Sequence, residues 1–228
     1  MSRQAPARPR IRGTLLAVAI TALIAPRADA DRLQADAARI DWAAGLVVAG
    51  GTGIADRHAP SPAVALGTSR RGADQAAKQR IADKLGALPL ASGGTLASKL
   101  GDPAIKARVA AVVDAAITVA AEPETDGSWH VTLGVPIEAL RQAIAGPRAL
   151  PASGDAGPAV VVVDGVAAKP AIGWTVGGTD AATLWVKDVP AWAKDAPHLR
   201  ASSAKAGAIT VDANPGTAST LYVLISKS

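Results

Sequence analysis

One stretch of the chain has the composition of a phosphate-binding turn. Residues 47–55 are VVAGGTGIA, and a glycine-rich turn after a strand presents backbone N–H groups to a pyrophosphate in dinucleotide-binding folds. The spacing does not fit, because the position three residues after Gly53 is Asp56, where the motif needs Gly or Ala and where a carboxylate repels phosphate. We therefore predict a tight turn or a cluster of sheet-edge glycines, with no cofactor-binding residue and no cofactor.

Asp126, Ser128 and His130 alternate along the chain, so on a strand their side chains would share one face. That arrangement resembles the polar groups of a hydrolase. Side chains two residues apart on a strand are about 6.6 Å apart, too far for the Ser–His hydrogen bond that activates a nucleophile. The chain also has no Gly-x-Ser-x-Gly turn. We interpret the three residues as a hairpin turn with a polar outer face, and we predict no catalytic residue and no enzyme.

Metal chemistry is not indicated either. The three histidines are His58, His130 and His198, and none has a histidine or carboxylate partner at helical spacing. The sequence contains no Cys, which excludes disulfides, thiolate metal sites and lipidated cysteines from the expected chemistry. We therefore predict no metal-binding residue.

Trp174, Trp185 and Trp192 lie close together near the C-terminal end of the chain. They could form a platform for a carbohydrate or a peptide, or they could fill a core in a chain that lacks Phe. The sequence leaves both interpretations open, so these three residues are its possible binding surface.

The charge of the chain is unevenly distributed. The formal net charge is +5, which usually suggests a nucleic-acid or membrane partner. Residues 1–30 carry five Arg and one Asp, and the rest of the chain carries 19 basic and 18 acidic residues. Without that first segment the protein is nearly neutral, so we expect no nucleic-acid partner.

Residues 1–30 have the pattern of an export signal. Arg8, Arg10 and Arg12 form a positive segment directly before the uncharged run 13–25, and Pro26 comes before the small-x-small sequence Ala28-Asp29-Ala30. We predict cleavage after Ala30 and a periplasmic or secreted product. The alternative is an uncleaved anchor, although the apolar run is well below the roughly 20 residues that span a bilayer. No later run reaches that length, so we predict no transmembrane segment in the mature chain.

The next part of the chain, 31–145, predicts an α+β domain in which helices pack on a small antiparallel sheet. A strand is expected within 38–54 and an amphipathic helix over 72–88, where Ala73, Ala77, Ile81 and Leu85 share one face. Asp102 and Pro103 predict the start of a second helix. Strands at 117–121 and 128–135 are expected to form a hairpin, followed by a short helix over 137–145.

The helix at 72–88 also carries a basic face, made by Arg70 and Arg71 before it and by Lys78, Arg80 and Lys84. Such a face is usually solvated, but it could contact an anionic partner such as a lipid headgroup or a cell-wall polymer. Peripheral contact with a membrane therefore stays open.

Residues 146–158 are rich in Pro, Gly, Ala and Ser and predict a linker. Beyond the linker, β-branched runs at 159–163, 182–186, 209–211 and 220–225 predict a small, mainly-β unit over 159–228. The chain contains 54 Ala and no Phe. We therefore expect cores built from Val, Leu, Ile, Ala and Trp.

The order of these elements resembles a known family. Two of the similar features are the strand that ends in 51–55 (GTGIA) and the alanine-rich helix with Gly72, Arg80 and Leu85. The others are three short sequences: Gly127-Ser-Trp129, PIEAL at 136–140, and AVVVVDGVAAKPAIGW at 159–174. Together they are similar to the twenty-kilodalton Helicobacter outer-membrane lipoprotein family, which includes the flagellar accessory protein FlgP and the N-terminal domain of FlgT. The chain departs from that family in lacking the lipobox Cys and in its final β segment.

The resemblance implies an α+β envelope domain without catalytic residues, which assembles with itself or with flagellar or outer-membrane components. We therefore predict an exported, non-enzymatic structural or assembly protein of the cell envelope. The alternative is a periplasmic ligand- or glycan-binding protein that uses the Trp-rich second unit.

Overall fold

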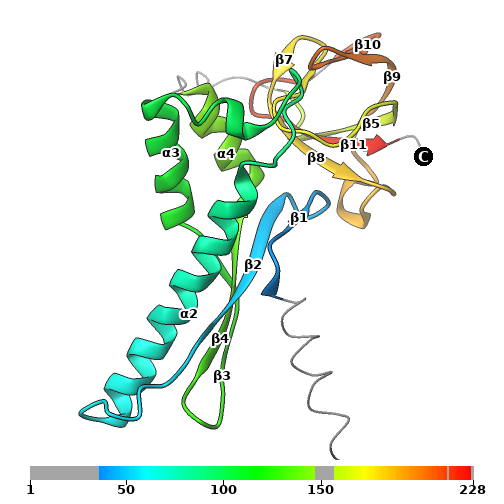
Figure 1. The fold of residues 1–228 in the computed structure, drawn as a ribbon. Helices are drawn as coiled ribbons and strands as arrows, with labels where there is room; N and C mark the ends of the chain where they lie inside the picture. Colours follow the sequence, from blue (N-terminus) through cyan, green and yellow to red (C-terminus); the bar gives the residue numbers. More distant parts are fainter. Residues whose placement is uncertain (1–35, 147–156, 215, 227–228) are drawn as a thin grey trace, which may run out of the picture. The chain divides into compact units, whose positions relative to one another are not determined.

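The protein contains two separate sheets, and the first is a four-stranded antiparallel sheet covered by helices (Figure 1). The computed structural model describes residues 36–146, 157–214 and 216–226. The first sheet has the order β1-β2-β4-β3 and the helices come from the same half of the chain. The elements are β1 (Arg39–Asp41), β2 (Leu46–Gly53), α2 (Pro62–Leu85), η1 (Leu96–Ser98), α3 (Pro103–Asp114), β3 (Ile117–Pro123), β4 (Trp129–Pro136) and α4 (Ile137–Ala145). This arrangement confirms the predicted α+β class.

The glycine-rich run is the second half of β2, and it lies directly under α2. A Cβ added at Gly51 would lie 2.6 Å from the backbone nitrogen of Ala77, and one added at Gly53 would lie 2.7 Å from that of Ala73. Both added atoms would also overlap carbonyl oxygens of the helix. Neither position can carry a side chain without moving the helix, so these glycines permit backbone-to-backbone packing.

The helix α2 begins at Pro62, well before the predicted start at Gly72. Ser61 caps it, because its hydroxyl accepts a hydrogen bond from the backbone nitrogen of Val64 at 3.3 Å, and Pro62 occupies the first helical position. The prediction began too late because the helix contains two glycines and carries its apolar face only in its second part. The predicted inner face is confirmed, since Ala73, Ala77, Ile81 and Leu85 are all buried.

The remaining helices and strands of the first half lie close to the residue ranges predicted from the sequence. Asp102 caps α3, accepting a hydrogen bond from the backbone nitrogen of Ala104 at 2.8 Å. The strands β3 and β4 form the predicted antiparallel hairpin, and α4 has the predicted bounds. The expected single strand at 38–54 is instead two strands, β1 and β2, paired antiparallel across a turn in which Gly45 has a positive φ of 67°.

The second half of the chain forms a seven-stranded sheet of order β7-β6-β10-β9-β5-β11-β8. Its elements are β5 (Val160–Val166), β6 (Thr175–Val176), β7 (Thr179–Asp180), β8 (Ala182–Val186), η2 (Ala191–Ala193), β9 (His198–Lys205), β10 (Ala208–Val211) and β11 (Leu221–Ser226). The pairs β5–β11, β8–β11 and β5–β9 are parallel. The mainly-β second unit is confirmed, with β5, β8, β10 and β11 close to the predicted runs.

Three strands of this sheet were not predicted. The strands β6 and β7 are two residues each, too short to show a pattern. The strand β9 has the sequence HLRASSAK, and its inner residues Leu199, Ala201 and Ala204 are only half-buried. Two of them are alanines and their alternation is interrupted before Ala204, so the apolar pattern of a half-buried strand is weak.

Each sheet has its own core, and the two halves are joined by hydrogen bonds. The second core contains Val161, Val163, Tyr222 and Leu224, with the Tyr222 hydroxyl donating to Asn214 Oδ1 at 2.8 Å. The backbone nitrogen of Ala91 donates to the carbonyl of Ile172 at 2.8 Å, and the side chain of Ile172 packs in the first core. Residues from Asp36 onward pack as one unit. The predicted signal peptide 1–30 and most of the predicted linker lie outside the described residues.

We predict that Gly51→Ala lowers the free energy of unfolding by about 2–3 kcal/mol, because the new methyl group overpacks the contact with α2. Gly101→Ala is the matched control, since a Cβ added there meets nothing within 4 Å, and we expect it to change stability by less than about 0.5 kcal/mol. Urea unfolding measures both. Equal stability of the two variants would contradict the close packing of β2 against α2.

Candidate functional site

The predicted polar group at the β3–β4 hairpin does not converge on one point. Asp126 Oδ1 accepts a hydrogen bond from the backbone nitrogen of Ser128 at 2.9 Å, and the Ser128 hydroxyl accepts one from the backbone nitrogen of Ala55 at 3.4 Å. Hydrogen bonds from Ser128 hold the pKa of Asp126 below its ordinary value of 3.8, and the bond from the Ser128 backbone has the largest effect. Asp126 and Ser128 therefore shape the turn, while His130 belongs to a different group.

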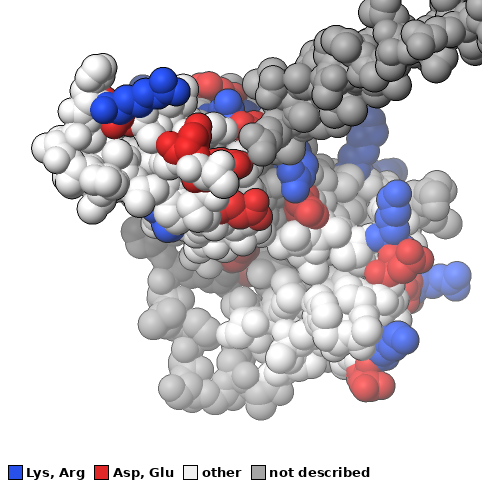
Figure 2. Space-filling model, turned by 90° about the horizontal axis from the view of Figure 1, so that it is seen from below, with Lys and Arg blue, Asp and Glu red and all other residues white. Residues whose placement is uncertain are grey.

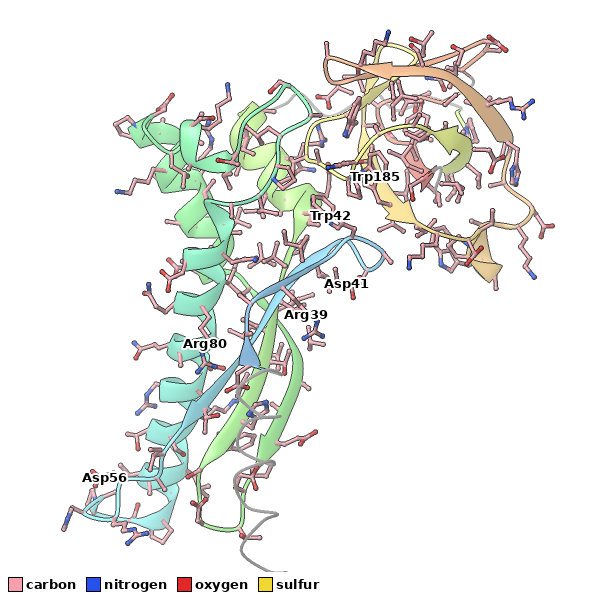
Figure 3. All side chains as sticks on the ribbon, turned by 45° about the vertical axis from the view of Figure 1, so that its right-hand side comes forward. Arg39, Asp41, Trp42, Asp56, Arg80 and Trp185 are labelled. Carbon is pink, nitrogen blue, oxygen red and sulfur yellow. The ribbon has the colours of Figure 1, made fainter. Side chains whose placement is uncertain are left out.

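His130 belongs to a cluster around Asp36, a carboxylate with only 4% of its surface exposed. The Arg80 guanidinium lies 2.9 Å from Asp36 Oδ2, and His130 Nε2 lies 3.3 Å from Oδ1 (Figure 3 labels Arg80). The Thr52 hydroxyl lies 3.4 Å from both Asp36 Oδ2 and His130 Nδ1. Sequence analysis missed this cluster, because its four members come from four segments far apart in the chain: the residues before β1, and β2, α2 and β4.

This cluster contains the groups of a Thr–His–Asp nucleophile but not their arrangement. Arg80 compensates the charge of Asp36, and it also donates to the carbonyl of Gly50 at 2.6 Å. The Thr52 hydroxyl lies as close to Asp36 as to His130, so the histidine is not its dedicated base. We interpret the cluster as an anchor that holds the segment at Asp36 against β2 and β4.

The other histidines also have ordinary surroundings. His198 Nδ1 lies 2.8 Å from Asp164 Oδ2, across the paired strands β9 and β5. The backbone nitrogen of His58 donates to Asp56 Oδ1 at 2.8 Å within the loop before α2. Within the described ranges, no group of three or more His, Asp or Glu side chains is arranged to hold a metal ion.

Arg141 on α4 is a buried cation that connects the two halves of the chain. Its guanidinium donates to both carboxylate oxygens of Glu138, at 2.7 and 2.6 Å, and to Asp180 Oδ1 of β7 at 2.5 Å. Hydrogen bonding to Glu138 raises the pKa of Arg141 above its ordinary value, so the side chain stays charged. Two carboxylates satisfy this charge, which makes Arg141 a structural link.

The three tryptophans predicted as a possible binding surface do not share one exposed face. Trp174 and Trp185 are buried in the core of the second sheet, with their rings edge to face and 6.2 Å between centroids. Trp192, the middle residue of η2, is 59% exposed. The chain lacks Phe, so the first two take the place of core aromatics.

Trp192 instead lines a groove with Trp42, which the sequence analysis did not single out. The groove has a volume of about 780 Å³ and lies between the β1–β2 hairpin and the segment that follows β8. Its lining also includes Trp185, and the backbone nitrogen of Trp185 donates to the carbonyl of Trp42 at 3.3 Å. Figure 3 labels Trp42 and Trp185 beside the charged residues Arg39 and Asp41. We refer to this feature as the Trp42–Trp192 groove.

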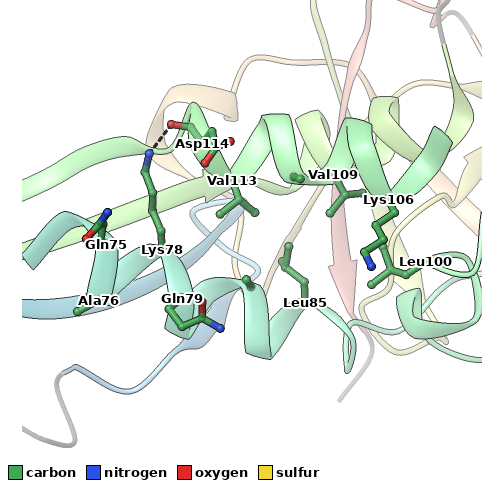
Figure 4. Close-up of a pocket in the computed structure, with 12 residues that line it drawn as sticks. Gln75, Ala76, Lys78, Gln79, Leu85, Leu100, Lys106, Val109, Val113 and Asp114 are labelled. Carbon is green, nitrogen blue, oxygen red and sulfur yellow. Dashed lines mark hydrogen bonds between the residues drawn. The ribbon is translucent and has the colours of Figure 1, made fainter. Parts of the chain in front are cut away.

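A second groove, of about 730 Å³, runs between α2 and α3 (Figure 4). Its floor is apolar, formed by residues such as Leu85, Val109 and Val113, and its rim carries Lys78 and Lys106. The Lys78 ammonium already donates to the carbonyl of Asp114 at 2.7 Å, which closes the C-terminal end of α3. The groove is the seam between two packed helices, and Gln79, another of its polar lining residues, is also engaged, since it donates to Asp83 at 2.8 Å.

The basic face predicted for α2 is largely engaged within the molecule. Arg70 stacks over the ring of Trp129 at 4.8 Å from its centroid, Lys78 binds a carbonyl, and Arg80 binds Asp36. In Figure 2, basic and acidic side chains are interspersed on the surface that faces the viewer. The described residues therefore give no support to a concentrated site for an anionic polymer.

The strand β3 is the outermost strand of the first sheet, and its outer edge has no paired strand among the described residues. Its first five residues, ITVAA, carry no charge. Ile117 is 48% exposed and Val119 is 52% exposed. Val119 lies over Gly134 of β4, since a Cβ added at that glycine would lie 3.1 Å from Val119 Cγ2. The edge of β3 therefore presents apolar side chains together with unpaired backbone groups.

Comparison with known proteins adds no further assignment, since neither a family model nor a curated protein matches the chain. Among the described residues, no helix has the length and apolar character needed to cross a bilayer.

We predict that Arg141→Met lowers the free energy of unfolding by about 2 kcal/mol. A broken buried ion pair costs about 3–5 kcal/mol, and we discount that figure because Glu138 and Asp180 are partly exposed and gain hydration. Arg71→Met is the control on exposed surface, with an expected change below about 0.5 kcal/mol. Chemical unfolding compares the two, and equal stability would exclude a structural role for Arg141.

Proposed function

We propose that this chain is an exported, non-enzymatic envelope protein that assembles through the edge of β3, either with itself or with flagellar or outer-membrane components. The observation that carries the proposal is the exposed, uncharged edge of β3. Export is proposed from the signal-like pattern of residues 1–30, and the envelope role is proposed from the resemblance stated above.

A free strand edge favours association because its backbone N–H and C=O groups can extend the sheet into another chain. On β3, the side chains of Ile117 and Val119 add apolar area that association would remove from water. Monomeric proteins usually protect such edges with charges, prolines or bulges. The first part of β3 has no charge and no proline, and of these three devices it carries only a bulge, at Val119. We propose that a partner strand pairs with the residues on either side of that bulge.

The far end of the same strand is protected. Glu122 and Pro123 close β3 with a charge and with a residue that has no backbone N–H. Pairing is therefore restricted to residues 117–121, a short segment. A short pairing segment suits a defined contact between two chains better than an open fibre.

We predict that the purified protein self-associates and that Val119→Lys weakens the association by about tenfold or more, because a charge at the edge must be desolvated for a strand to pair. Val64→Lys is the matched control, since Val64 is 43% exposed on α2, away from the sheet edge. Sedimentation velocity over a range of concentrations measures the association. Equal association of both variants would contradict the proposal.

If the wild-type protein is a monomer in solution, the same edge is tested with a photo-crosslinker at Ile117 in cells that express the protein. A cross-linked envelope protein, lost in Val119→Lys and retained in Val64→Lys, supports a partner at β3. A monomer that forms no such cross-link would refute assembly through this edge.

A further inference from the structure

The Trp42–Trp192 groove combines an exposed aromatic ring with unpaired charges of both signs. Trp192 keeps 59% of its surface exposed, a large apolar area for a side chain of this kind. The groove volume of about 780 Å³ lies in the range of small-ligand sites. The groove is separate from the β3 edge, because the groove lies at β1, and β1 and β3 are the two opposite edge strands of the first sheet.

The walls of the groove come from two segments far apart in the chain. One wall is the end of β1 with Arg39, Asp41 and Trp42, and the other is the segment after β8 with Lys187, Asp188 and Trp192. Leu184, Trp185 and Val186 of β8 line the groove between them. The hydrogen bond from the Trp185 nitrogen to the Trp42 carbonyl connects the two segments at this point. This hydrogen bond holds Trp42 beside β8, and Trp192 is carried by η2, whose neighbouring residue Ala193 is buried.

The charges in the groove indicate the chemistry of a ligand. Arg39 and Lys187 are donors, Asp41 and Asp188 are acceptors, and none of the four forms an ion pair with another described residue. Asp41 Oδ1 accepts a hydrogen bond from the backbone nitrogen of Ala44 at 2.8 Å, which leaves Oδ2 for a ligand. The formal charges cancel, so the groove does not select a strong anion or cation. A hydroxyl group both donates and accepts, so a ligand rich in hydroxyls can bind carboxylates and cationic groups at once.

Strand addition by a peptide does not suit this groove. The edge of β8 is already used where Trp185 donates to Trp42. The neighbouring strand β1 is three residues long, which leaves little free edge for an incoming strand. A proline-rich peptide would stack on the tryptophans but would offer few donors to Asp41 and Asp188.

We propose that the Trp42–Trp192 groove binds a neutral oligosaccharide. The ring of Trp192 packs against the apolar C–H face of a sugar unit, and Asp41, Asp188, Arg39 and Lys187 bind its hydroxyls. Aromatic stacking supplies the contact area, and the charged groups orient the sugar.

The test uses the whole protein labelled with ¹⁵N at tryptophan, whose five indole N–H groups give separate NMR signals. The probes are chitohexaose, cellohexaose and maltohexaose, with decaproline as the peptide comparison. We expect at least one oligosaccharide to shift the signals of Trp42 and Trp192 while that of Trp129, outside the groove, stays in place. Titration calorimetry then gives the affinity of the oligosaccharide that binds.

Trp192→Ala is expected to weaken that affinity by about tenfold or more, because it removes the stacking surface. Asp188→Asn is expected to weaken it less, because the amide keeps one oxygen acceptor. Ile54→Ala is the control, since Ile54 is 83% exposed and does not line the groove. Thermal melts check that each variant is folded.

Three results would overturn the proposal. They are the absence of a shift with all three oligosaccharides, a shift of the groove signals with decaproline alone, and an oligosaccharide affinity that Trp192→Ala leaves unchanged. None of these results bears on assembly through β3, because Val119→Lys does not alter the groove and Trp192→Ala does not alter the β3 edge.

Discussion

The close approach of α2 to β2 is the contact on which the first half of the protein depends. Gly51 and Gly53 have no side chain between the strand and the helix, and Ala73 and Ala77 face them from α2. Helix and sheet backbones therefore lie nearer to one another than bulky residues would allow. The larger side chains Ile81 and Leu85 continue the buried face of α2 after the two alanines. This arrangement explains part of the high alanine content, since small residues are required on both sides of the contact.

This packing also decides where polar chemistry can take place. The glycine run that resembled a phosphate-binding turn lies under a helix, so its backbone is not open to a ligand. Asp36, Arg80 and His130 come together where β2 is no longer flanked by β1, and there they hold the chain in place. The polar residues that could suggest catalysis are therefore occupied in turns and anchors. The surfaces that we propose for function are the edge of β3 and the Trp42–Trp192 groove.

Local signals predicted the first half of the fold well. Asp102 and Pro103 marked the start of α3, and the spacing from Ala73 to Leu85 marked the buried face of α2. Both signals act within a few residues of the chain, so no knowledge of the partner element is needed. The strand β9 was missed for the opposite reason. Its apolar residues Leu199, Ala201 and Ala204 are only partly buried and its other residues are polar, so it is a strand because β5 and β10 pair with its backbone.

The candidate sites were predicted less well than the fold, because their residues are brought together only by tertiary contacts. Sequence spacing grouped Trp174, Trp185 and Trp192, but the sheet places the first two in its core and pairs the third with Trp42, far away in the chain. The fold class, the helix caps and the pairing of the hairpin strands follow from residue propensities and hydrophobic periodicity, which are local properties of the sequence. The identity of an edge strand, the burial of Asp36 and the partners of each tryptophan follow from which distant segments pack together. Those contacts have no local signal, so the amino-acid order alone does not reveal them.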